Sequence, residues 1–151
     1  MTLAGDAAIT ARLQALAPEG VRDMIPPPCI LDMQGELLEY VENASLTVRF
    51  PVLPRYRNPL GNMQGGFIVA ALDNTLGPLS FLVAPPSATS ALNTQYLRPV
   101  GAAQAVLVCT ARVVERTRNT LHLAAEARLA DGKVVAICQS TNQILPAPAK
   151  A

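Results

Sequence analysis

The chain has 151 residues and a net charge of +1, and 50% of its residues are hydrophobic but only 15% are charged. That length suits one domain, and a charged share below the roughly 25% of typical domains indicates apolar surface covered by a second copy. The charges are mixed along the chain and 4% of residues are aromatic, which argues against a nucleic-acid-binding protein.

The cysteines and the N-terminus indicate a cytoplasmic protein. Cys29, Cys109 and Cys138 are odd in number and widely spaced, which gives neither a disulfide framework nor a zinc pattern. The N-terminus lacks the basic start and unbroken apolar core of a secretory signal. The longest apolar run, residues 67–72, is too short to span a bilayer, so no membrane association is expected.

The first predicted element is a short amphipathic helix over residues 6–16, where apolar side chains recur at spacings of four and three. The prolines at residues 26–28 then predict a loop. We interpret residues 1–34 as an appendage or lid of a single domain that spans residues 1–151. The core of that domain is expected at residues 35–145, with a frayed tail at residues 146–151.

A strand with alternating polar and apolar residues is predicted at residues 45–50, after a shorter one at residues 35–40. Gln64-Gly65-Gly66 then opens a helix that is apolar on nearly every side, so we expect it to be buried. Gly77-Pro78 is expected to kink or weaken this helix, and Pro85-Pro86 to end it.

The remaining elements are strands, predicted at residues 89–97, 103–116, 120–130 and 134–144. Asp131-Gly132 is a strong hairpin signal and Arg118-Asn119 a weaker one. Strands joined by hairpins are antiparallel. The sequence therefore predicts an α+β domain in which an antiparallel sheet wraps around one long helix.

Asp73 is unusual because it lies inside the most hydrophobic helix, where an unpaired buried carboxylate is costly. Either the helix turns Asp73 to solvent, or its carboxylate is a functional group with a perturbed pKa. Gly65-Gly66 at the start of the same helix favours the second interpretation. Free backbone N–H groups at a helix start can stabilise negative charge that develops on a carbonyl oxygen.

The spacing of these residues limits how they can act together. Asp73 follows Gly65 by eight residues, which places them about 12 Å apart along the helix axis. A single reacting carbonyl must lie about 3 Å from both groups. If both are catalytic, each site therefore takes Gly65 from one subunit and Asp73 from another, which requires at least a dimer.

Three motifs follow one another along the chain: Asn58-Pro-Leu-Gly61-x-x-Gln64-Gly65-Gly66, then Ala71-Leu-Asp73-x-x-x-Gly77, then Leu92-Asn-x-x-Tyr96-Leu97-Arg98-Pro99. Together they resemble the hotdog-fold acyl-CoA thioesterases, and within them the phenylacetate-pathway and 4-hydroxybenzoyl-CoA thioesterase group. The resemblance covers residues 45–144. It implies the hotdog fold, a homodimer or homotetramer with sites between subunits, and hydrolysis of a small-molecule acyl thioester.

The resemblance also implies roles for individual residues. Asp73 matches the catalytic carboxylate, which acts as general base or nucleophile, and the N–H of Gly65 matches the oxyanion donor. Asn58 matches an amide that holds the attacking water or the substrate carbonyl, and Thr89 or its neighbour Ser90 matches a hydroxyl that orients the water. No metal is implied, and no separate cofactor, because coenzyme A arrives as part of the substrate.

One departure from the family is Gln64, which stands where the family usually has histidine. Glutamine cannot exchange protons near neutral pH, but it can still position partners through hydrogen bonds. Gly66, Ser90, Met63 and Arg98 are the expected substrate-binding residues. Arginine suits the phosphates of coenzyme A, whereas Met63 is also explained as a core residue.

Two alternatives to a hydrolase stay open. Gln64 is compatible with a non-catalytic acyl-CoA-binding or regulatory hotdog protein. A purely structural oligomer would leave Asp73 exposed or salt-bridged, with no pocket between subunits. The single histidine, His122, is expected on the polar face of a late strand, which argues against hotdog hydratases and dehydratases and against a Ser-His-Asp hydrolase.

Overall fold

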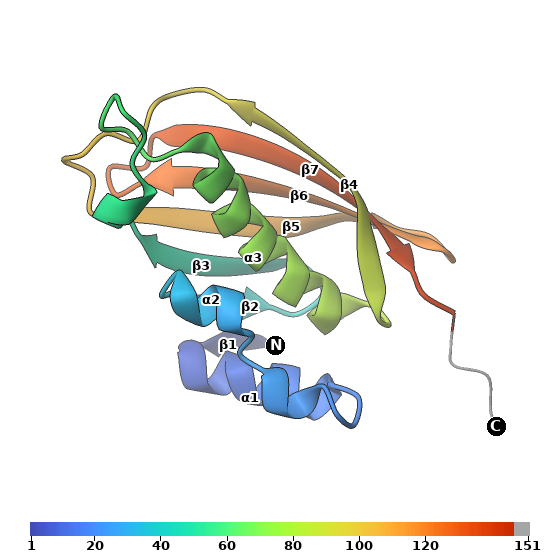
Figure 1. Ribbon diagram of the computed structural model, residues 1–151. Coiled ribbons are helices and arrows are strands. Elements are labelled where there is room, and N and C mark those ends of the chain that lie inside the picture. The colour runs from blue at the N-terminus through green and yellow to red at the C-terminus, as the bar shows by residue number, and fades with distance from the viewer. Residues whose placement is uncertain (147–151) are drawn as a thin grey trace.

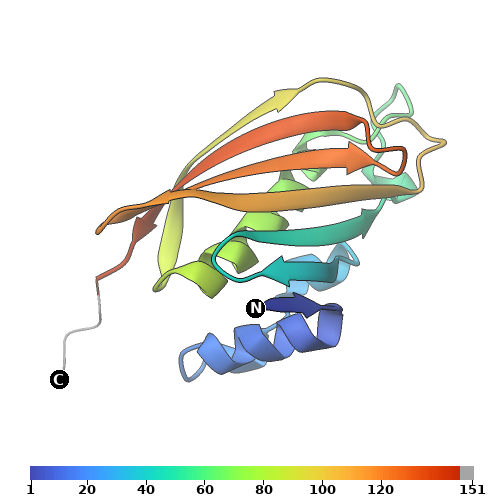
Figure 2. The same cartoon turned by 180° about the vertical axis from the view of Figure 1, so that it is seen from behind.

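The computed structural model describes residues 1–146, in which one long helix crosses one face of a seven-stranded sheet (Figure 1). Within these residues, no helix covers the opposite face of the sheet (Figure 2). The strands are β1 (Thr2–Ala4), β2 (Glu36–Val41), β3 (Ser45–Pro51), β4 (Ser87–Tyr96), β5 (Val106–Arg116), β6 (Thr120–Leu129) and β7 (Val134–Ile144). The helices are α1 (Asp6–Leu16), α2 (Pro28–Asp32) and α3 (Gly65–Val83), with short 3₁₀ turns η1 (Arg22–Met24) and η2 (Pro54–Tyr56).

Every strand pair in the sheet is antiparallel, in the order β1-β2-β3-β5-β6-β7-β4. β1 and β4 are therefore the two edges. This confirms the predicted α+β class, with an antiparallel sheet and one long central helix. All predicted strands are present, and β1 is a short addition that the sequence did not indicate.

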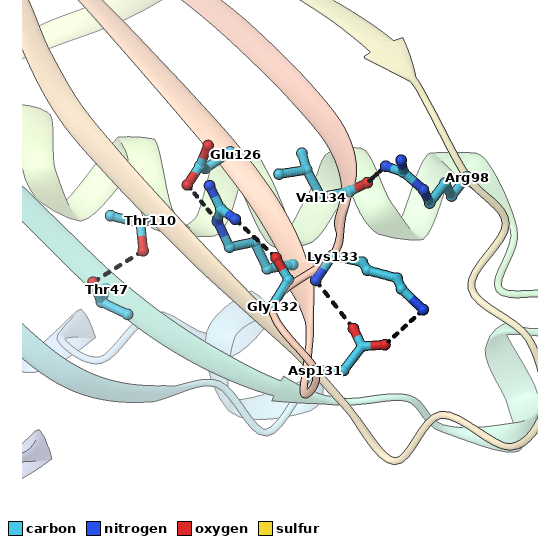
Figure 3. Close-up of polar contacts among 9 residues, drawn as sticks. Thr47, Arg98, Thr110, Glu126, Asp131, Gly132, Lys133 and Val134 are labelled. Atoms are coloured by element: carbon cyan, nitrogen blue, oxygen red, sulfur yellow. Dashed lines mark hydrogen bonds and ion pairs between the residues drawn. The ribbon is translucent and has the colours of Figure 1, made fainter.

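The predicted hairpin at Asp131-Gly132 joins β6 to β7. Gly132 has a φ of +86°, a conformation that favours glycine. The carboxylate of Asp131 accepts a hydrogen bond from the backbone N–H of Lys133 at 3.0 Å and pairs with its ammonium at 3.1 Å (Figure 3). These contacts hold the turn and with it the register of β6 against β7.

α3 is continuous from Gly65 to Val83 and runs through Gly77-Pro78, so these residues do not end the helix, and their effect as a kink or weak point stays a prediction. Proline lacks an N–H and cannot donate to the carbonyl of Asn74, but the packed face of the helix holds it together. That face includes Ala71, Leu72 and Leu79, all fully buried. The expectation that the helix is buried is confirmed for the face that packs on the sheet, whereas Asp73 on the opposite face is exposed.

Within residues 1–146, α3 is the one helix whose length and mean hydropathy, 1.5 over its most apolar window, would allow it to cross a membrane. Half of that window is buried inside the fold, as in the core helix of a globular domain.

The N-terminal segment is more closely integrated than an appendage. β1 pairs with β2 in the same sheet, and α1 buries Ile9 and Leu13 in the common core. α2 replaces part of the loop predicted from the proline triplet, because Pro28 occupies the first position of a helix, where its missing N–H costs nothing. Of the predicted tail, only Pro146 lies within the described residues.

Candidate functional site

Asp73 lies on the outward face of α3, opposite the residues that pack on the sheet. Its neighbours Ala71 and Leu72 are fully buried, whereas Asp73 is exposed in the single chain. Enough protein surrounds the carboxylate that partial burial raises the pKa of Asp73 above its usual range. Asp73 is therefore reachable from solvent and holds its proton more readily than a surface aspartate.

Asp73 borders a cavity of about 440 Å³ that runs along the outward face of α3. The cavity is lined by residues of α1, the segment from residue 21 to α2, α3, β4 and β7. Thr89 of β4 lines the same cavity. The structure thus brings together two of the predicted site residues, Asp73 and Thr89, from elements that follow one another in the chain.

Ser90, the other predicted hydroxyl, belongs to a different environment. Its hydroxyl donates to the carbonyl of Thr141 at 3.0 Å, and it does not line the cavity. Of the two predicted hydroxyls, the one that lines the same cavity as Asp73 therefore belongs to Thr89.

Two buried polar residues of β7 that were not predicted from the sequence, Ser140 and Asn142, form a hydrogen-bonded chain that ends at Thr89. The hydroxyl of Ser140 donates to Oδ1 of Asn142 at 2.6 Å, and Nδ2 of Asn142 donates to Oγ1 of Thr89 at 3.4 Å. Both β7 residues are nearly fully buried, at 3% and 2% exposed. The signal was present, because Ser140 and Asn142 are polar residues at inward positions of a strand, where a core residue would be apolar.

The start of α3 presents the two predicted glycines. Gly65 and Gly66 are its first two residues, so their N–H groups have no acceptor within the helix, and the preceding Gln64 provides no side-chain cap. The ring of Tyr96 lies beside Gly65, where an added Cβ would come within 3.0 Å of the phenol oxygen. Because the helix is continuous, Gly65 and Asp73 lie about 12 Å apart along its axis.

The side-chain oxygen of Asn58 forms hydrogen bonds within its own loop. Its Oδ1 accepts from the backbone N–H groups of Leu60 at 3.0 Å and Asn62 at 3.2 Å, and this turn leads the chain into α3. Only Nδ2 remains as a donor toward a ligand. Gln64 is exposed, and its backbone N–H donates to the carbonyl of Tyr56 at 2.7 Å.

Two expected substrate-binding residues lie away from the cavity. Met63 is 3% exposed and belongs to the hydrophobic core, which agrees with the alternative interpretation of that residue. The guanidinium of Arg98 donates to the carbonyl of Val134 at 2.6 Å, which ties the end of β4 to the start of β7 (Figure 3). Neither residue lines the wall around Asp73.

The single histidine and the buried thiol of Cys109 also lie outside the cavity. His122 lies on the outer face of β6, within hydrogen-bond distance of the hydroxyls of Thr120 and Thr141. Burial raises the pKa of the Cys109 thiol to about 12, so it stays protonated. Across residues 1–146, no three His, Cys, Asp or Glu side chains gather as metal ligands would.

A second hollow, of about 510 Å³, lies on the outer face of the sheet. It is lined by polar side chains such as Arg112, Glu126 and Gln139 and contains none of the predicted catalytic residues. Glu126 of this lining also pairs with Arg128, whose Nε lies 2.6 Å from Oε1 of Glu126 (Figure 3).

Comparison with known families and structures places this geometry in context. The profile of the thioesterase superfamily matches residues 60–136, which is 77 of the 151 residues. No curated protein matches the chain.

Solved structures match over most of the chain. The PaaI protein from the phenylacetic acid degradation operon of Escherichia coli is 17% identical, with a TM-score of 0.78 over 91% of this chain and 96% of that chain. A phenylacetic acid degradation-related protein from Ralstonia eutropha JMP134 is 28% identical, with a TM-score of 0.71 over 90% and 98%. A hypothetical thioesterase protein from Streptococcus pneumoniae TIGR4, solved with coenzyme A, is 17% identical, with a TM-score of 0.74 over 83% and 97%.

Proposed function

The chain belongs to the thioesterase superfamily, and from that premise we propose that it hydrolyses an acyl-CoA or other acyl thioester to the free acid and the thiol. The observation that carries this proposal is that Asp73, with its raised pKa, and the hydroxyl of Thr89 line the same cavity. A carboxylate of this kind at a cavity is the arrangement expected of a catalytic base or nucleophile.

In this mechanism, the oxygen of water attacks the thioester carbonyl, a C–O bond forms and the C–S bond breaks. Asp73 takes a proton from the water and returns one to the departing thiolate. The alternative is direct attack by Asp73, followed by hydrolysis of the resulting anhydride. Thr89 suits the task of orienting water, because its oxygen accepts from Asn142 and its own O–H proton is left free to point into the cavity.

The oxyanion donor in this proposal is the N–H of Gly65 from a second subunit. The distance of about 12 Å along α3 is too long for Gly65 and Asp73 of one chain to reach one carbonyl. Gln64, which directly precedes Gly65, and Asn58, through Nδ2 in the loop that leads into α3, would position the substrate from that second subunit.

The edge strand β4 offers a way to build such a site. β4 pairs with β7 on one side only, so its other edge presents unpaired backbone groups. Thr89, at the start of β4, shares the cavity with Asp73, and Tyr96, at its end, lies against Gly65. Antiparallel pairing of two β4 strands about a twofold axis would bring Gly65 of the partner subunit toward Asp73.

Coenzyme A is the thiol that we propose as the carrier, and a fold neighbour solved with coenzyme A supports this choice. The cofactor would enter as part of the substrate, and the chemistry proposed for Asp73 and Gly65 requires no metal. Arg98 and Gly66 remain proposed contacts for the carrier rather than for the acyl group. A substrate of this kind also fits a cytoplasmic location.

The test is hydrolysis of a panel of aryl- and fatty-acyl-CoA thioesters by the wild type and by Asp73→Asn. General acid–base groups contribute about 10²–10⁴-fold to rate, so we expect the variant to lose at least about a hundredfold of kcat on any thioester that the wild type hydrolyses. Circular dichroism shows whether the variant remains folded. An equally active Asp73→Asn would contradict the catalytic role of Asp73.

A second candidate function is acyl-CoA binding without turnover, favoured by Gln64 in place of the family's histidine. It predicts that coenzyme A thioesters bind to the wild type and are not hydrolysed by it. Calorimetric titration beside the hydrolysis panel separates the two functions, because only an enzyme releases free thiol.

A further inference from the structure

The N-terminal segment forms one wall of the cavity that holds Asp73. The lining includes Met24, Pro26, Cys29 and Leu31 from the segment between residue 21 and the end of α2. Figure 1 shows this segment beside α3, on the side away from the β4 edge. Residues 21–31 also lie outside the stretch that matches the thioesterase superfamily.

Residues 21–31 are anchored to the rest of the fold by hydrogen bonds and by a buried side chain. The amide of Gln14 donates to the carbonyl of Ile25 at 2.8 Å, and Ile30 packs into the core at 4% exposed. The thiol of Cys29 donates to Oδ1 of Asn74 at 3.2 Å, next to Asp73 itself. The segment is thus attached to both α1 and α3.

The chemistry of the lining selects a class of ligand. Most of the residues are apolar, and the charged ones, Asp6 and Asp73, are both acidic. No Lys, Arg or His from the described part of the chain lines the cavity. A volume of about 440 Å³ falls within the usual range for small-molecule sites, about 300–1,000 Å³. An anionic group placed here would lose hydration and find no cation among these lining residues.

We propose that residues 21–31 form the acyl-binding wall of the active site and restrict the substrate to an uncharged, apolar acyl group, with rejection of acyl groups that end in a carboxylate. This inference rests on the proposed function, because it takes the cavity beside Asp73 as the place of the acyl group. Gly77, which lines the cavity, leaves room for that group, since a Cβ added there would meet nothing within 4 Å.

The experiment measures binding separately from chemistry. Calorimetry gives the Kd of non-hydrolysable thioether analogues of acetyl-, hexanoyl- and adipoyl-CoA. The adipoyl chain has as many carbons as hexanoyl and adds a terminal carboxylate. We expect the wild type to bind the hexanoyl analogue at least about tenfold more tightly than the adipoyl analogue.

Two variants then alter the cavity. Met24→Arg supplies a cation, so the hexanoyl preference over adipoyl should shrink at least about tenfold. Gly77→Leu fills space, so the preference for hexanoyl over acetyl should shrink by a similar factor. The control is Val114→Arg, because Val114 is as exposed as Met24, at 53% against 55%, and lies outside the cavity. Met24→Arg alters an exposed side chain and carries the test if Gly77→Leu fails to fold.

The outcomes separate this inference from the proposed function. Wild-type ratios in both variants, or equal binding of all three analogues by the wild type, overturn the acyl wall whether or not thioesters are hydrolysed. Selective binding that responds to Met24→Arg supports the wall. If the same proteins hydrolyse no thioester, the catalytic proposal fails while the selective pocket remains.

Discussion

At the scale of single residues, Asp73 combines a position on an apolar helix with access to solvent. Burial raises its pKa, so the ionised form is less favourable in the folded protein than in the unfolded chain. Between the usual pKa of aspartate, about 3.9, and the raised value, the folded state binds more protons. Stability should therefore decrease as pH rises through that window.

Replacement of Asp73 by Asn removes this ionisation. We expect Asp73→Asn to unfold at the same temperature as the wild type or a higher one at pH 7, with the difference decreasing toward pH 3. Thermal unfolding followed by circular dichroism between pH 3 and 7 measures this. A variant less stable than the wild type at pH 7 would instead make Asp73 a structural anchor, as in a purely structural oligomer.

At the scale of elements, the position of Gly65 at the start of α3 allows a proline substitution to remove its N–H without disrupting the helix. Gly65 is the first helical residue, where proline is well tolerated, and Gln64 before it has φ −61° and ψ 135°, the conformation that a residue preceding proline prefers. Gly65→Pro therefore deletes the donor and preserves the helix.

Loss of one oxyanion donor costs about 10²–10³-fold in kcat, which is the effect expected for Gly65→Pro. Gly65→Ala is the matched control, because it keeps the N–H and introduces the same Cβ beside Tyr96. Steady-state kinetics on the best thioester compares them. If both variants lose equal activity, the contact with Tyr96 is responsible and the N–H has no catalytic role.

At the scale of the whole molecule, a site shared between subunits makes a distinct prediction. A hybrid dimer of one Gly65→Pro chain and one Asp73→Asn chain contains one site with both substitutions and one intact site. Coexpression with two affinity tags isolates this hybrid, and we expect up to about half of wild-type activity from two nearly inactive parents. If each site came from one chain, the hybrid would be as inactive as its parents.

Much of this architecture could be predicted from the sequence. The hairpin turns and the alternation of the late strands indicated the antiparallel sheet, and the apolar helix carrying Asp73 indicated its central element. The integration of residues 1–34 could not be predicted, because a three-residue strand and a five-residue helix leave too little periodic pattern. The pairing of Asn142 with Thr89 also depends on which strands become neighbours, and β4 and β7 are far apart in the sequence.

The position of the N-terminal wall also matters for how such a protein can be altered. The residues proposed for catalysis, Asp73 and Gly65, lie within residues 60–136, whereas residues 21–31 lie in a separate stretch of the chain. Substitutions in this stretch can change the shape of the cavity, and with it the range of acyl groups that bind, without replacing a residue proposed for catalysis. In laboratory evolution, a library confined to the exposed side chains of residues 21–31 would therefore explore new substrates while the catalytic chemistry stays constant.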